Sequence, residues 1–257
     1  MQYKISIIIP VLNEKVHIGK LLKHLQTVSS RENISEIIVV DGGSTDGSQD
    51  IVKAMSGLTR LLSLFEMESR PHNDLSTSLE VTSVLLLEST KGRAKQMNLG
   101  AKWASGSIFY FLHADSFPPK HFDQLIISEV KKGHNAGCFR MQFDSTHWWL
   151  KLASWFTRFN WKSCRGGDQS LFITQSLFQT IGGYDERYTI YEDNILIKEL
   201  YNRKQFIVIN KKLKSSARMY RKHGVWKLQY YYWRIHLKQW FGADANALYR
   251  YYKRKIC

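Results

Sequence analysis

Cysteine is scarce in this 257-residue chain, and its distribution excludes two kinds of architecture. The three cysteines, Cys138, Cys164 and Cys257, are odd in number and widely spaced. They form neither the paired spacing of a zinc site nor the framework of a disulfide-rich domain. The chain is therefore expected to work in a reducing compartment, where thiols stay free.

Long hydrophobic runs are also missing. No stretch approaches the roughly 18 consecutive apolar residues that a membrane-spanning helix needs. The start, MQYKISIIIP, has no small-residue cleavage site, so we predict no signal peptide. Aromatic residues make up 13% of the chain, which argues against disorder. These absences predict a cytoplasmic globular protein, and they leave open a peripheral attachment to the cytoplasmic face of a membrane.

Negative charge is scarce, above all near the C-terminus. The formal net charge is +15. Residues Lys211 to Cys257 include thirteen Lys and Arg residues but only one acid, Asp244, so their net charge is +12. Such an excess favours an anionic partner, namely phosphates, anionic lipid or nucleic acid.

Strand-like and helix-like segments alternate along the first half of the chain. Apolar runs predict four strands, at Ile5–Ile9, Glu36–Val40, Val84–Glu88 and Ile108–Leu112. Helical spacing of apolar residues between them predicts crossover helices, and hence an α/β fold built on a parallel sheet. Such sheets bind ligands beyond the C-terminal ends of their strands. The polar segment Ser69–Ser83 is predicted to be a surface insertion.

Acidic residues follow several of these strands. Glu14 lies shortly after the first strand, Asp41 directly after the second, and Asp115 just beyond the fourth. Glu192 and Asp193 begin a later predicted helix. A capping or turn role explains each acid taken alone, but their joint position favours a ligand site.

Five segments follow one another along the chain, SIIIPVLNE, IIVVDGGSTDGS, KGRAKQMNLGAKWASG, FLHADS and GGYDERYTIYED. Their order resembles that in family 2 glycosyltransferases of the GT-A fold. More narrowly, GRAKQMN, FLHAD, CFRMQFD and GDQSLFI resemble the subgroup labelled rSAM/selenodomain-associated transferase 2. The resemblance implies a Rossmann-like nucleotide-diphospho-sugar transferase fold with a mixed, mostly parallel sheet. A basic aromatic helical extension follows at the C-terminus.

The same resemblance implies a division of the chain. Residues 1–210 are expected to form the glycosyltransferase domain, with a nucleotide-binding half at 1–117 and an acceptor-binding half at 118–210. Residues 211–257 are expected to form the extension, whose cations are mixed with aromatic residues such as the run Tyr230–Trp233.

In this family the last acid of a D-x-D triplet holds a divalent cation, Mn²⁺ or Mg²⁺, which offsets charge on the diphosphate leaving group. The triplet here is His113-Ala114-Asp115, so the resemblance assigns the metal to Asp115. His113 stands where an aspartate usually approaches the ribose, which puts that contact in question. A neutral imidazole can still hydrogen-bond a hydroxyl or a phosphate, and a packed core histidine is the alternative.

The resemblance also implies which residues bind the nucleotide. Asp41 matches the acid that binds the base, and a turn residue is its alternative interpretation. The other residues assigned to the nucleotide are Pro10, Asn13, Glu14, Arg93, Lys95, His113, Ala114 and Arg218. A cation at Arg93 or Lys95 would offset diphosphate charge, whereas a solvated helix face is the plainer interpretation.

An inverting transferase needs a base that deprotonates the acceptor hydroxyl. The pair Glu192-Asp193 matches the family's ED pair, with Asp193 as the first candidate and Glu192 as the second. A capping acid is the alternative. The resemblance places Gly167, Asp168 and Gln169 beside the acceptor or the donor sugar.

The predicted function is metal-dependent, inverting transfer of a sugar from a nucleotide-diphosphate donor, with UDP-sugar favoured. The acceptor is unknown, and a lipid-linked one would suit the tail. A nucleotidyltransferase and a non-catalytic sugar-nucleotide or nucleic-acid binding protein are the alternatives. For the tail, a helix in a membrane interface is favoured, followed by a helix packed on the domain and then by nucleic-acid binding.

Overall fold

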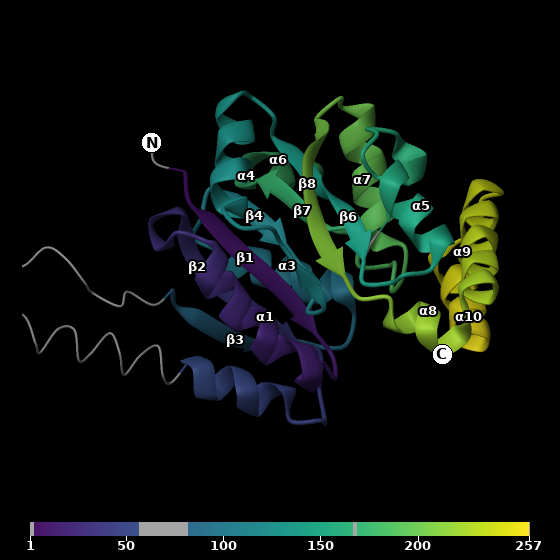
Figure 1. Cartoon of the computed structure of the whole chain (residues 1–257), viewed down its shortest axis with the longest axis horizontal. Helices are drawn as coiled ribbons and strands as arrows, with labels where there is room; N and C mark the ends of the chain where they lie inside the picture. Colours follow the sequence, from purple (N-terminus) through teal and green to yellow (C-terminus); the bar gives the residue numbers. More distant parts are fainter. Residues whose placement is uncertain (1–2, 57–81, 167–168, 257) are drawn as a thin grey trace, which may run out of the picture.

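The computed structural model describes residues 3–56, 82–166 and 169–256 (Figure 1). Most of the polar segment predicted at Ser69–Ser83 lies outside these residues, as do Gly167 and Asp168. The described strands are β1 (Ile5–Val11), β2 (Ile34–Asp41), β3 (Val84–Glu88), β4 (Ile108–Phe111), β5 (Ser116–Phe117), β6 (Ala136–Phe143), β7 (Leu171–Thr174) and β8 (Phe206–Ser215).

These strands form one sheet in the order β3-β2-β1-β4-β7-β6-β8-β5. β1 runs parallel to β2 and β4, β2 runs parallel to β3, and β6 runs parallel to β8. β7 is antiparallel to both β4 and β6, and β5 is antiparallel to β8. The sheet is therefore mixed and mostly parallel, as predicted. Because β1, β2 and β4 share one direction, the loops that follow them leave from the same edge.

Helices cover both faces of this sheet. They are α1 (Lys15–Val28), α3 (Arg93–Trp103), α4 (Phe122–Lys131), α5 (Trp148–Phe156), α6 (Gln175–Ile181), α7 (Glu192–Asn202), α8 (Arg218–His223), α9 (Val225–Trp240) and α10 (Ala245–Lys255). Two short 3₁₀ turns, η1 (Arg31–Asn33) and η2 (Lys162–Cys164), and a helix over residues 48–56 complete the described elements.

Alternation along β1 explains how the two faces are filled. Ile7 belongs to a buried cluster with Leu21 of α1 and Phe122 of α4, so these two helices cover one face. Ile8 points the other way and belongs to a cluster with Met97 of α3 and residues of α6 and α7. Every residue of β1 is buried, which is the pattern of a central strand covered on both sides.

α3 approaches the sheet closely because it carries a glycine at the contact. A Cβ atom on Gly100 would lie 2.5 Å from Cγ2 of Ile8 and 3.2 Å from Cγ2 of Val40. No larger side chain fits there without movement of the strands. This close approach holds the first residues of α3 beside the loops that follow β1 and β2.

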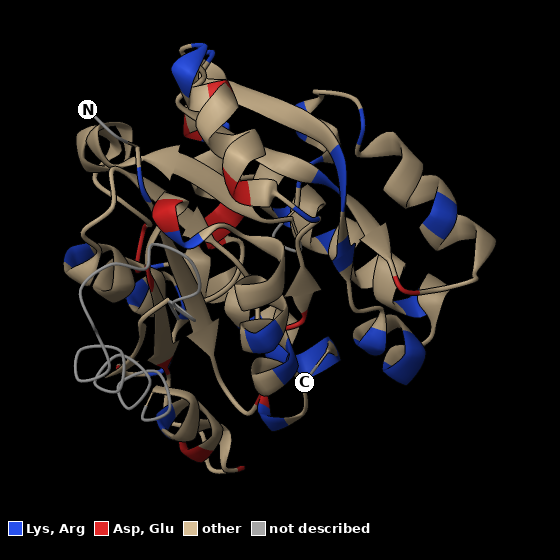
Figure 2. Cartoon of the chain, turned by 60° about the vertical axis from the view of Figure 1, so that its left-hand side comes forward, with Lys and Arg blue, Asp and Glu red and all other residues tan. Residues whose placement is uncertain are grey.

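The C-terminal part of the chain packs around a third cluster of its own. β8 extends beyond the strand predicted at Phe206–Ile209, and it crosses residue 210 without a break. The helices that follow bury Leu228, Ile235 and Leu248 together with Phe143 of β6. α9 and α10 lie at the end of the molecule away from β3 (Figure 1). Lys and Arg residues, drawn in blue, lie beside the C-terminus (Figure 2).

Among the described residues, none of the helices combines the length and the apolar character that crossing a bilayer demands.

Candidate functional site

The loop after β1 is held by the loop after β2. Asn13 adopts a left-handed backbone conformation, with a φ of 57°. Its Oδ1 accepts a hydrogen bond from the backbone N–H of Thr45 at 2.9 Å, and its own N–H donates to Oγ of Ser44 at 2.8 Å. The N–H of Glu14 donates to Oγ of Ser48 at 2.9 Å. Asn13 therefore connects the two loops, and Glu14 leaves its carboxylate for other partners.

Asp41 is the last residue of β2 and is almost fully buried. Its Oδ1 accepts hydrogen bonds from the N–H groups of Gly43 (2.9 Å) and Ser44 (2.8 Å) and from the amide of Gln49 (2.9 Å). Burial raises the pKa of Asp41, but the hydrogen bonds from Ser44, Gln49 and Gly43 outweigh it and hold the pKa below its usual value. Oδ2 is buried and accepts no hydrogen bond within the described ranges. A ligand N–H group would satisfy it.

Arg218, the first residue of α8, reaches the same edge from the C-terminal part of the chain. Its Nη1 donates to Oε2 of Glu14 at 2.7 Å, and its Nη2 donates to Oε1 of Glu14. Its Nε lies 3.4 Å from Oδ2 of Asp115, just beyond β4. The backbone also joins the two segments, because the N–H of Ser216 donates to the carbonyl of Asp115 at 3.3 Å. The structure thus brings the predicted metal ligand into contact with a predicted phosphate-binding cation.

A small pocket joins four of the predicted site residues, from four parts of the fold. Pro10 comes from β1, His113 follows β4, Gln169 precedes β7 and Asp193 lies in the first turn of α7. The full lining is Pro10, Met97, Phe111, Leu112, His113, Gln169, Leu171, Tyr184 and Asp193. His113 is half-buried, and Ala114 behind it is buried in the core. Asp193 is itself buried there, so its carboxylate meets little water.

The adjacent acid, Glu192, has a different environment from Asp193. Glu192 is fully buried, and its Oε1 lies 2.7 Å from Nε of Arg93. Burial raises the pKa of Glu192, and the positive charge of Arg93 opposes that rise. Lys95 is exposed, and no ion pair of Lys95 occurs among the described residues. Of the two predicted cations on α3, Arg93 is therefore engaged with Glu192, and Asp193 is the acid that lines the pocket.

Two polar residues of α3, Gln96 and Asn98, position this region, and neither was predicted to be a site residue. The amide of Gln96 donates to the carbonyls of Val11 at 2.8 Å and Val40 at 2.7 Å, so it joins the ends of β1 and β2. Asn98 accepts from the N–H of Tyr184 and donates to the carbonyl of the same residue, both at 2.9 Å. In the sequence, Gln96 is a polar residue between the apolar residues Ala94 and Met97. This pattern is the signal that would have identified it.

Tyr184 was also missed, although it lies within the quoted block GGYDERYTIYED. Tyr184 lines the pocket, and its buried hydroxyl forms no hydrogen bond with the described residues. Burial raises the pKa of Tyr184, and the negative charges of Asp193 and Glu192 raise it further. The Tyr184 hydroxyl therefore keeps its proton beside the two acids.

Arg165 is a buried cation that organises the loop before β7. It donates to the carbonyls of Thr157 at 2.7 Å and Phe159 at 2.6 Å, and to Oε1 of Gln169 at 2.8 Å. No single motif predicts this role, because the acceptors of Arg165 lie at five separate positions between Cys138 and Gln169.

Replacing Arg165 by Met is expected to lower the free energy of unfolding by about 3 kcal/mol, because several buried acceptors lose their donor. Urea denaturation followed by circular dichroism measures this. Arg187→Met is the control, since Arg187 is 85% exposed and pairs with Asp185 at the surface. Equal midpoints for the two variants would contradict the assigned role of Arg165.

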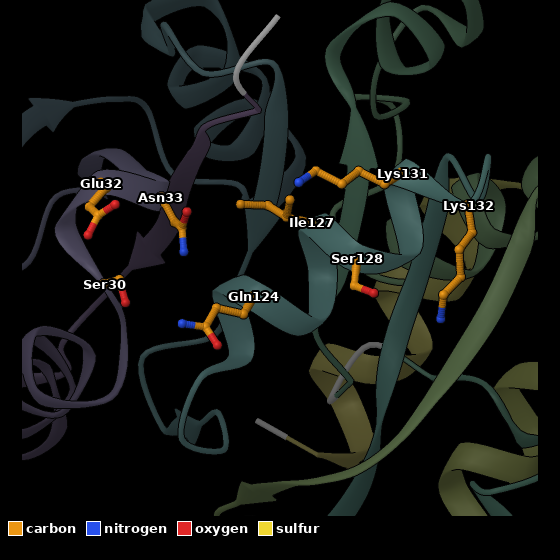
Figure 3. Close-up of a pocket in the computed structure, with 8 residues that line it drawn as sticks. All are labelled: Ser30, Glu32, Asn33, Gln124, Ile127, Ser128, Lys131 and Lys132. Carbon is orange, nitrogen blue, oxygen red and sulfur yellow. The ribbon is translucent and has the colours of Figure 1, made fainter.

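A larger hollow of about 560 Å³ lies elsewhere, between η1 and α4 (Figure 3). Its lining residues are Ser30, Glu32, Asn33, Gln124, Ile127, Ser128, Lys131 and Lys132. η1 precedes β2, so this hollow lies near the N-terminal start of that strand, whereas the candidate site follows the strand ends. None of the predicted site residues lines it.

Comparison with known proteins identifies relatives of the chain. A family model described as Glycosyl transferase family 2 matches residues 6–198. Glycosyltransferase AglE of Haloferax volcanii is 26% identical over 126 residues, which cover 49% of this chain and 35% of that protein. Probable glycosyltransferase YdaM of Bacillus subtilis is 24% identical over 215 residues, which cover 77% of this chain and 47% of that protein.

Solved structures share the fold at low identity. S. aureus TarS 1–349 in complex with UDP has a TM-score of 0.62 and 16% identity, covering 83% of this chain and 60% of that one. Mannosyltransferase PcManGT from Pyrobaculum calidifontis, in complex with GDP-Man and Mn²⁺, has a TM-score of 0.64 and 17% identity, covering 93% and 62%. These likenesses confirm the predicted GT-A fold.

The chain spans less than two thirds of the length of each of these four proteins. The narrower subgroup stays a prediction. The family match itself extends over well more than half of the chain, from β1 into α7. The chain therefore belongs to glycosyl transferase family 2.

Proposed function

We propose that this protein transfers a sugar from a nucleoside diphosphate sugar to an acceptor hydroxyl, with inversion at the anomeric carbon. The observation that carries the proposal is the grouping of Asp41, Asp115 and Arg218 along the loop edge of β1, β2 and β4, close to the pocket that holds Asp193. Relatives solved with UDP or GDP-Man support a nucleotide-sugar donor. That the acceptor is linked to a lipid stays a prediction.

Asp41 is proposed to recognise the base. Its buried Oδ2 needs a donor, and uracil and guanine both carry a ring N–H group that meets this need. Hydrogen bonds to Oδ1 keep the carboxylate ionised and oriented. We favour UDP, as the sequence predicted. Pro10, Asn13 and Glu14 then form the wall of the nucleotide site that follows β1.

Asp115 suits a divalent cation whose other ligands would come from the donor diphosphate and from water. Within the described ranges, no group of three or more His, Cys, Asp or Glu side chains is placed to hold a metal by itself. Mg²⁺ and similar ions are commonly bound by one or two carboxylates together with substrate phosphates and water. Asp115, with a side chain 18% exposed, is suited to be that carboxylate. When bound, the cation would offset charge developing on the leaving diphosphate.

Asp193 is proposed to be the catalytic base. It takes the proton of the acceptor hydroxyl as that oxygen bonds to the anomeric carbon and the bond from this carbon to the diphosphate oxygen breaks. Glu192 suits the role less, because it is fully buried and paired with Arg93. Gly167, Asp168 and Gln169 are proposed to lie beside the sugars, and Arg93 and Lys95 to add positive charge near the donor.

Arg218 is proposed to bind the diphosphate, since its guanidinium already lies among the carboxylates of the donor site. Arg218→Met is expected to raise the KM for the donor by about tenfold or more, because a charge-assisted hydrogen bond is lost and two carboxylates remain. Initial rates against donor concentration measure this. Arg221→Met is the matched control from the same helix, because Arg221 pairs with Asp144 at 2.9 Å instead. A KM equal to that of the control would argue against the assignment.

Calorimetric titration with UDP and with GDP, each with and without Mn²⁺, tests the donor site. We expect UDP to bind, and to bind more tightly with Mn²⁺. Absence of binding for both nucleotides under every metal condition would refute the proposal. The products separate it from nucleotidyl transfer, because glycosyl transfer releases UDP from a UDP-sugar, whereas nucleotidyl transfer releases pyrophosphate from a nucleoside triphosphate.

A further inference from the structure

One face of α9 exposes large apolar side chains at regular intervals. They are Trp226, Tyr230, Trp233, Leu237 and Trp240, between 46% and 80% exposed. The alternating spacing of four and three residues places them along a single face of the helix. Phe241, directly after the helix, is 81% exposed.

The exposed face is not the one by which α9 packs on the protein. Leu228 and Ile235, seven residues apart, are buried in a cluster that also contains Leu248 and Tyr251 of α10. α9 is therefore apolar on two faces, and its packing on the rest of the molecule uses only one. Packing within the described residues leaves the other face in contact with solvent.

α5 adds a second row of exposed side chains beside the first. Trp148, Leu152, Trp155 and Phe156 are exposed on this helix. The ring centroid of Trp226 lies 5.8 Å from that of Trp148 and 5.3 Å from that of Trp149, so the two helices are side by side. Figure 1 shows α5 between the sheet and the C-terminal helices. The exposed apolar side chains of α5 and α9, together with Phe241, are called the aromatic surface below.

The two segments that carry the aromatic surface have charge of one sign. Residues 148–162 and 225–241 contain no Asp or Glu at all. They contain six cations, which are Lys151, Arg158, Lys162, Lys227, Arg234 and Lys238. Three of these lie over aromatic rings. Arg158 is 5.1 Å from the ring centre of Trp155, Arg234 is 6.0 Å from that of Tyr230, and Lys238 is 5.3 Å from that of Tyr251.

We propose that the aromatic surface docks on an anionic phospholipid bilayer, with α9 lying in the plane of the interface. Exposed Trp and Tyr side chains favour the headgroup region, where an apolar ring and a polar edge are both satisfied. Lys and Arg beside them attract anionic headgroups, and the lack of acids removes the repulsion that such headgroups would meet. A contiguous apolar area of this kind on a folded protein indicates an interaction site.

Docking would also hold the donor site near the membrane. α8, which carries Arg218, ends at His223, and Gly224 alone separates it from α9. A lipid-linked acceptor would then reach the site from the bilayer, a consequence that rests on the proposed function. The docking itself depends on the aromatic surface and its charges alone.

Co-sedimentation of the full chain with vesicles tests the docking. We expect binding to vesicles of phosphatidylcholine mixed with phosphatidylglycerol, weaker binding to phosphatidylcholine alone, and weakening by added salt. The paired replacement Trp240→Ser and Phe241→Ser should reduce partitioning by about tenfold or more, because both rings lose their place in the interface. Trp103→Ser, 62% exposed at the end of α3, is the control and should bind as the unmodified chain does.

A second pair of variants tests the charge. Lys227→Glu with Arg234→Glu is expected to weaken binding to the anionic vesicles by roughly 20-fold or more. Lys20→Glu with Lys23→Glu, on the exposed side of α1, is the control with the same change in net charge. Circular dichroism melting confirms that each variant is folded.

Three outcomes would overturn the docking proposal. One is that the folded chain fails to sediment with anionic vesicles, and another is that the aromatic and charge variants bind like their controls. The third is that the chain self-associates without lipid through Trp240 and Phe241. The aromatic surface would then be a contact between two copies of this chain. Asp115→Asn should keep vesicle binding, and the Trp240 and Phe241 variant should keep UDP binding in solution. Failure of one proposal is thereby distinguished from failure of the other.

Discussion

Replacing Asp193 by Asn is expected to lower kcat for sugar transfer by about a thousandfold, with donor affinity nearly unchanged. The amide has the same shape as the carboxylate, but it cannot take the proton of the acceptor hydroxyl. Because Asp193 is buried in a small pocket with His113 and Tyr184, little water is available there to replace it as the base. UDP release from a UDP-sugar, measured with an acceptor found by screening, gives the rate.

Two further substitutions decide how that result is interpreted. Asp185→Asn changes an acid in the same sequence block that pairs with Arg187 at the surface, and it should leave kcat close to the unmodified value. Glu192→Gln tests the second candidate for the base. If Glu192→Gln abolished turnover while Asp193→Asn retained it, the assignment of the base would be reversed.

Asp115→Asn is expected to remove the metal dependence of nucleotide binding. With Mn²⁺ present, the affinity for UDP should fall by about a hundredfold, to the value measured without metal. The physical reason is that an amide oxygen carries no net charge, so the site loses the anionic ligand that holds the cation. Calorimetric titration of UDP with and without Mn²⁺ measures both affinities.

The matched control for this second prediction is Asp144→Asn. Asp144 also pairs with an arginine of α8, since its Oδ1 lies 2.9 Å from Nη1 of Arg221. It should alter the binding of UDP very little, with or without Mn²⁺. Mn²⁺-dependent tightening that survived in Asp115→Asn would show that the metal is held by other residues.

Much of the fold could be predicted from the sequence because its signals are local. Apolar runs marked β1 to β4, and the acids that follow three of them were correctly expected at strand ends. Parallel strands bring their carboxyl ends to one edge, so order along the chain was enough to group Glu14, Asp41 and Asp115. The order of the quoted motifs added the family, which the family match confirms.

Other features depended on contacts between distant residues. The sequence could not separate Glu192 from Asp193, because neighbours at the start of a helix point in different directions that only packing distinguishes. The structure buries Glu192 against Arg93 and places Asp193 in the pocket. Arg165 and Tyr184 were missed for a related reason, since only the folded structure shows that the guanidinium of Arg165 and the hydroxyl of Tyr184 are buried.

The sequence by itself determined the alternating strands and helices, the acids at the strand ends and the basic aromatic composition of the tail. Each of these features depends on residues that are neighbours along the chain. Only the tertiary structure decided that Arg218 meets Glu14, 204 positions earlier, and that α5 and α9 expose their aromatic rows side by side. Such contacts arise when the sheet and its covering helices come together around a shared core. Composition and periodicity describe what each segment buries, and the packed fold decides which side chains meet.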